Sequence, residues 1–129
     1  MRRRVATLSA LALVAVLAGA ASAEAKIRFF RTPSHNIVCV YSSKGGPGPF
    51  LRCDVLSLND VGFTLRRRFR AKRRHVTDSA NDPRSKTLPY GTSRRFGPFT
   101  CTSRTTGLTC RARRSGHGFF LSRASQRVF

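Results

Sequence analysis

Hydrophobic and polar residues alternate in several short runs along this chain, which is the pattern typical of half-buried β-strands. Such runs occupy residues 26–31, 37–42, 50–55, 61–65, 99–103, 108–112 and 119–122. Proline, glycine, serine and asparagine separate them, most clearly at residues 32–36 and 43–49, and these residue types favour turns. No apolar stripe of helical period is longer than two turns, so the chain is predicted to be all-β with no major helix.

The first pair of cysteines predicts the register of a hairpin. We test a bond between Cys39 and Cys53. In that register Ile37 faces Val55, and the whole cystine side of the hairpin is apolar whereas the other side is mixed. An antiparallel hairpin that lies on a core shows this division, and a slip of one residue would destroy it.

The second pair predicts another hairpin, closed by a bond between Cys101 and Cys110. Its connection at residues 104–107 ends in glycine, which is common in hairpin loops of this length. Four cysteines allow three pairings, and free thiols or a zinc site are the alternatives; the lack of a C-x-x-C spacing argues against zinc. We predict the disulfides Cys39–Cys53 and Cys101–Cys110, which support a small antiparallel sandwich or open barrel.

The N-terminal residues have the form of a secretory signal peptide. Residues 2–4 are arginines, residues 5–20 are mostly apolar, and residues 21–23 form a small-residue cleavage site. We expect cleavage near Ala23, and retention as a membrane anchor is the alternative. The prediction is a signal peptide at residues 1–23 and a single domain at residues 24–129, with no transmembrane segment after cleavage. Disulfides suit the oxidising compartment that such a protein enters, so we expect it to be secreted or associated with the cell envelope.

Charge adds a prediction about partners. The chain has 25 basic and 5 acidic residues, and without residues 1–23 it has 22 basic residues and a net charge of +17. Such a charge attracts polyanions, either nucleic acid or an acidic envelope polymer, without conferring specificity. The predicted polyanion-binding residues are Arg66, Arg67, Arg68, Arg70, Lys72, Arg73, Arg74, Arg111, Arg113 and Arg114. The alternative is a solvated edge or loop whose charge only keeps the protein soluble and unpaired.

Residues 66–86 are predicted to be a mobile middle segment. Their first part is the basic run, and residues 76–86 are polar and rich in turn-forming residues. If residues 66–74 formed one strand, alternate arginines would stand on opposite faces of it. A membrane-active role would need an amphipathic element, and this run offers only Phe69 and Ala71 as apolar residues.

His117 is the one residue that suggests catalysis. A histidine in a tight turn could act as an acid or a base, but Gly116 and Gly118 on either side favour a purely structural turn. The sequence has no G-x-S-x-G or H-E-x-x-H motif. We therefore predict no catalytic set, no metal site and no cofactor.

Several segments carry a resemblance that covers most of the chain after residue 23. They are FRTPSHNIVC at residues 30–39, LRCD at 51–54, LPYG at 88–91, FTC at 99–101, GLTC at 107–110 and GHGFFLSR at 116–123. In their order and spacing these segments resemble a family of small secreted, disulfide-containing actinobacterial proteins with no assigned function. The resemblance implies secretion and disulfides but no activity. Members often have glycine in place of His35, tryptophan near Val61, and an additional cysteine pair in the middle, one partner of which would fall near His75. Neither of these cysteines is present, so the middle region is expected to be less well ordered here.

The sequence thus predicts an exported, monomeric binding or envelope-associated protein with non-specific affinity for polyanions. A weak secreted ribonuclease-type hydrolase that uses His117 is the alternative.

Overall fold

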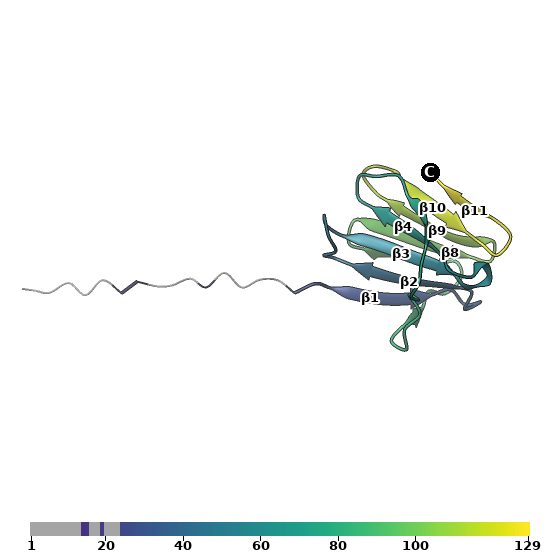
Figure 1. Cartoon of the computed structure of the whole chain (residues 1–129), viewed down its shortest axis with the longest axis horizontal. Coiled ribbons are helices and arrows are strands. Elements are labelled where there is room, and N and C mark those ends of the chain that lie inside the picture. Colours follow the sequence, from purple (N-terminus) through teal and green to yellow (C-terminus); the bar gives the residue numbers. More distant parts are fainter. Residues whose placement is uncertain (1–13, 16–18, 20–23) are drawn as a thin grey trace, which may run out of the picture.

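The computed structural model of the protein describes residues 14, 15, 19 and 24–129. The expected signal peptide at residues 1–23 therefore lies almost wholly outside the described residues. Two β-sheets stack face to face, and the elements of the described part are strands apart from one short 3₁₀ helix (Figure 1). None of its helices is long and apolar enough to cross a membrane. The fold is the predicted all-β sandwich.

The first sheet has six strands in the order β5-β4-β3-β2-β1-β6. They are β1 (Ile27–Arg31), β2 (Ile37–Ser42), β3 (Phe50–Val55), β4 (Val61–Arg66), β5 (Lys72–His75) and β6 (Lys86–Thr87), and the 3₁₀ helix η1 (Leu56–Leu58) follows β3. Neighbouring strands are antiparallel except β6, which pairs in parallel with the end of β1. The chain therefore leaves β5 at one edge of this sheet and re-enters it at the other edge.

The second sheet has five strands in the order β11-β10-β9-β8-β7, all antiparallel. They are β7 (Ser93–Phe96), β8 (Phe99–Arg104), β9 (Gly107–Ala112), β10 (Gly118–Leu121) and β11 (Gln126–Val128). Successive hairpins join them, so this sheet is a meander of short connections. The edge strands are β7 and β11.

Both cystine hairpins have the predicted register. Cys39 is bonded to Cys53 across β2 and β3, and Cys101 is bonded to Cys110 across β8 and β9. All four cysteines are fully buried and face the interior between the sheets. In the chain-entropy picture, closing loops this short stabilises the fold by roughly 3 kcal/mol per disulfide.

Aromatic side chains from the two sheets meet in the core. The rings of Phe30 on β1 and Phe96 on β7 are stacked, with centroids 4.4 Å apart. At the opposite side of the sandwich Phe63 on β4 and Phe119 on β10 lie 6.2 Å apart. Each buried phenylalanine contributes about 1.5–3 kcal/mol through removal of apolar surface from water. These contacts set the two sheets face to face without a tryptophan.

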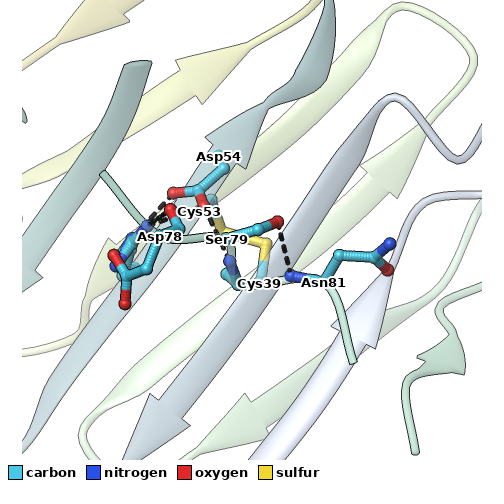
Figure 2. Close-up of polar contacts among 8 residues, drawn as sticks. Cys39, Cys53, Asp54, Asp78, Ser79 and Asn81 are labelled. Carbon is cyan, nitrogen blue, oxygen red and sulfur yellow. Dashed lines mark hydrogen bonds and ion pairs between the residues drawn. A yellow bond between two sulfur atoms is a disulfide. The ribbon is translucent and has the colours of Figure 1, made fainter. Parts of the chain in front are cut away.

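Residues 76–85 cross the outer face of the first sheet, from β5 to β6, and we call them the crossing segment (Figure 1). Asp54 on β3 anchors its middle, because the carboxylate accepts a 2.8 Å hydrogen bond from the backbone N–H of Ala80. Arg52 on the same strand binds Asp78, and Figure 2 shows Asp78 lying next to Asp54. Ala80 is buried against the sheet. The sequence predicts a mobile segment at residues 66–86. In the structure β5 precedes the crossing segment, β6 follows it, and hydrogen bonds to β3 hold its middle.

Candidate anion-binding surfaces

Acidic side chains are concentrated at the crossing segment. The four aspartates lie between residues 54 and 82, and residues 83–129 contain no acidic residue. Asp54 and Asp78 both bind Arg52, and Asp82 binds Arg84 through its two oxygens. The hydrogen bond from Arg52 lowers the pKa of Asp78. Three of the chain's five acids thus pair with Arg52 and Arg84, and the other arginines of the described residues have no ion pair.

Three arginines of the predicted basic run have structural contacts. The guanidinium of Arg66 donates hydrogen bonds to the carbonyl oxygens of Gly45 and Gly48, at 2.7 and 3.3 Å, and so holds the glycine-rich β2–β3 loop. Arg70 donates a 3.2 Å hydrogen bond to the carbonyl of Val128 and covers part of the exposed edge of β11. Arg73 lies over the ring of the buried Phe63, 5.9 Å from its centroid. The run is therefore partly a structural element, which neither the polyanion-binding prediction nor its alternative, a solvated edge or loop, included.

The remaining cations of the run are exposed on the β4–β5 hairpin. They are Arg67, Arg68, Lys72 and Arg74. Arg66 ends β4, residues 67–71 form the connection, and β5 begins at Lys72. At the tip Phe69 is 63% exposed, beside a hollow of about 320 Å³ that Arg67 and Arg68 also line. The hairpin therefore presents cations to solvent around a hollow that belongs to one sheet only.

The second predicted basic cluster is divided by the fold. Arg111 lies on the outer face of the second sheet, over the ring of Phe129 at 5.1 Å. Arg113 turns back and donates a 3.1 Å hydrogen bond to the carbonyl of Phe99. Arg114 is exposed in the β9–β10 turn. Two of the three side chains thus have contacts within the second sheet and its neighbouring loop, and Arg114 is the one for which no such contact is found among the described residues.

His117 belongs to the same turn, and its backbone holds the turn in place. Its carbonyl accepts a 2.8 Å hydrogen bond from the N–H of Ala112. Gly116 has φ of 76°, a conformation that favours glycine. A Cβ on Gly118 would overlap the carbonyl oxygen of Cys110 on β9. Each glycine therefore has a structural reason, and we interpret the turn as part of the scaffold.

A further basic surface, which the sequence did not predict, lies where β1, β6 and β7 meet at one side of the sandwich. We call it the edge groove. It has a volume of about 440 Å³ and three apolar lining residues, Ile27, Phe29 and Phe96. Its cations are Arg28, Arg84, Lys86, Arg94 and Arg95. No acidic residue lines it. The residues that line the groove come from three separate segments of the chain, at residues 27–29, 84–86 and 94–96, which explains why no sequence motif marks it.

One family model matches the chain, over residues 48–129, and its description is a family of unknown function, DUF6636. The matched region begins in the β2–β3 loop and includes all of the second sheet and the crossing segment. No curated protein and no solved structure is significantly similar to the chain.

Proposed function

Since the chain belongs to this family of unknown function, we propose a role from its own surface: an exported, monomeric protein that binds anionic polymers, in solution or at the cell envelope, and does not cleave them. The observation that carries the proposal is the segregation of charge. Three of the five acids are paired with Arg52 and Arg84 at the crossing segment, and residues 85–129 contain eight arginines and no acidic residue. A field of one sign over such a surface concentrates polyanions near it.

Two structural features support the location and the monomeric state. Two buried disulfides suit an oxidising, extracellular environment. Arginines and lysines occupy the edge strands β5, β7 and β11, and charges on edge strands disfavour pairing with another sheet. A protein that does not associate through its edges leaves its basic surface free for a ligand.

A salt titration tests the proposal. The protein, with both disulfides formed, is titrated with fluorescent polyphosphate at increasing NaCl concentration, and neutral dextran of similar length serves as the control polymer. We expect log K to fall linearly with log salt, because each neutralised phosphate releases counterions. Affinity that does not change between low and high salt would refute electrostatic binding, as would equal binding to dextran.

A further inference from the structure

Within the proposed function, the edge groove is the surface built to hold a ligand. Arg28 stands two residues before Phe30 on β1, and Arg94 stands two residues before Phe96 on β7. Side chains two residues apart on a strand share a face. Each arginine therefore continues the inward-facing row that ends in the Phe30–Phe96 stack. The two guanidinium groups flank the mouth of the sandwich, one from each sheet.

The crossing segment adds cations to the same place. β6 pairs in parallel with β1, which sets Lys86 beside Phe30. Arg84 lies over the ring of Phe29, 4.7 Å from its centroid, and is paired with Asp82. Among the described residues, the side chains of Arg28, Lys86, Arg94 and Arg95 have no ion pair. The groove therefore presents four cations without an ion pair, together with the side chain of Ile27, which is 56% exposed.

The chemistry of the groove favours phosphate groups over bases. Guanidinium groups form paired hydrogen bonds with phosphate oxygens, and their charge is fixed at any physiological pH. Proteins that hold single-stranded nucleic acid also stack bases on free aromatic faces. Here Arg84 covers the ring of Phe29, and Phe96 is only 2% exposed because it is stacked on Phe30. The groove therefore offers a base little aromatic surface on which to stack.

We propose that the edge groove binds the backbone phosphates of a base-free phosphodiester polymer, of the poly(glycerol phosphate) type that an exported protein can meet at a cell envelope. This rests on the proposed function and specifies its site and its ligand class. The open β4–β5 hairpin contributes general attraction, whereas the groove brings cations of both sheets to one stretch of polymer.

Two triple variants with the same change of charge test the assignment. Each replaces two arginines and one lysine, all exposed. The groove variant carries Arg28→Gln, Lys86→Gln and Arg94→Gln. The matched control carries Arg67→Gln, Arg68→Gln and Lys72→Gln. Binding of poly(glycerol phosphate) and of a single-stranded oligonucleotide with the same number of phosphates is measured for both variants and the unmodified protein. Thermal unfolding and non-reduced peptide mapping verify that each variant is folded.

We expect the groove variant to bind poly(glycerol phosphate) roughly 100-fold more weakly at 0.1 M salt, with a salt slope smaller by about 2, because three contacts each contribute about 0.7 to the slope. The control should lose less than about threefold, since a charge beyond the Debye length of about 10 Å is screened at this salt concentration. Equal losses of affinity in the two variants would overturn the groove assignment and leave general polyanion binding in place. If the unmodified protein binds the oligonucleotide more than about tenfold more tightly than poly(glycerol phosphate), the groove is assigned to nucleic acid instead. Salt-independent binding by the unmodified protein would refute the proposed function itself.

Discussion

Asp54 is the acidic residue on which the attachment of the crossing segment depends, and Asp54→Ala tests this directly. Asp54 is only 4% exposed. Its Oδ1 accepts a 2.8 Å hydrogen bond from Nε of Arg52, and its Oδ2 accepts bonds from Nη2 of Arg52 and from the N–H of Ala80, at 2.9 and 2.8 Å. The substitution removes all three acceptor contacts and leaves the buried Ala80 N–H without its partner.

The magnitude follows from these contacts. An unpaired buried N–H costs about 1–3 kcal/mol, and a hydrogen bond to a charged group contributes about 1.5–3 kcal/mol. Arg52 retains Asp78, so part of its loss is recovered. We expect the free energy of unfolding to fall by about 3 kcal/mol, at the lower end of what breaking a buried ion pair costs. For a domain of this size the urea slope is about 1–2 kcal/mol per M, which predicts a midpoint lower by about 2 M.

The assay is equilibrium unfolding in urea, with both disulfides intact, followed by far-UV circular dichroism. Asp78→Ala is the matched control, because it removes a partner of the same Arg52 from a carboxylate whose side chain is 78% exposed. Exposed ion pairs contribute little, so its midpoint should stay close to that of the unmodified protein. Equal midpoints for the two variants would refute the anchoring role of Asp54.

Three further predictions concern pH, the β9–β10 turn and catalysis. Hydrogen bonds from Arg52 and Arg84 lower the pKa of Asp78 and of Asp82. A carboxylate with a lowered pKa stabilises the fold above its unfolded pKa of about 3.9, and this contribution is lost as the pH falls through its folded pKa. The urea midpoint should therefore fall on acidification below about pH 4, and by less in Asp78→Ala; a midpoint that rises would contradict the sign. Gly118→Ala should destabilise the fold by more than about 2 kcal/mol, because its Cβ overlaps backbone of β9; thermal unfolding measures this, and an unchanged Tm would show that the strands can separate. RNA should stay intact when it is incubated with the unmodified protein or with His117→Ala. Cleavage of RNA by the unmodified protein that is absent in His117→Ala would establish the hydrolase alternative.

The hairpins were predictable because their determinants are local. In the hairpin closed by Cys39 and Cys53, strands a few residues apart carry alternating apolar side chains, and the cystine admits one register that places them on one side. The same holds for Cys101 and Cys110. Both registers are found as predicted. Short-range alternation and one covalent link are sufficient there, since a slip by one residue would turn every core side chain outward.

The crossing segment was not predictable in the same way. It buries only small side chains such as Ala80, and its attachment depends on Asp54, which is distant in sequence. The parallel pairing of Lys86 with Phe30 is likewise a long-range contact of two residues. The composition therefore indicated a loop, and only the folded structure shows that hydrogen bonds attach this loop to the first sheet.

The candidate site shows the same division. The basic run was visible in the sequence, but nothing local distinguished Arg66, which holds a loop, from Arg67, which is exposed. The edge groove left no local signal, because its cations are brought together by the pairing of β6 with β1 and by the stacking of the two sheets. The net charge could be counted from the sequence, whereas the place on the surface where the cations gather could not be predicted.

Both the pairing of the acids and the edge groove follow from the same topological step. A chain that leaves β5 and re-enters the sheet at β6 must cross its outer face, and the polar groups of that crossing need partners on the sheet and within the segment. Asp54 and Asp78 meet this need through Arg52, and Asp82 meets it through Arg84. The crossing then ends at the edge where Lys86 joins the arginines of β1 and β7. Three of the acids are therefore used where the crossing segment is held, and among the described residues Lys86, Arg28 and Arg94 remain without an ion pair where it ends.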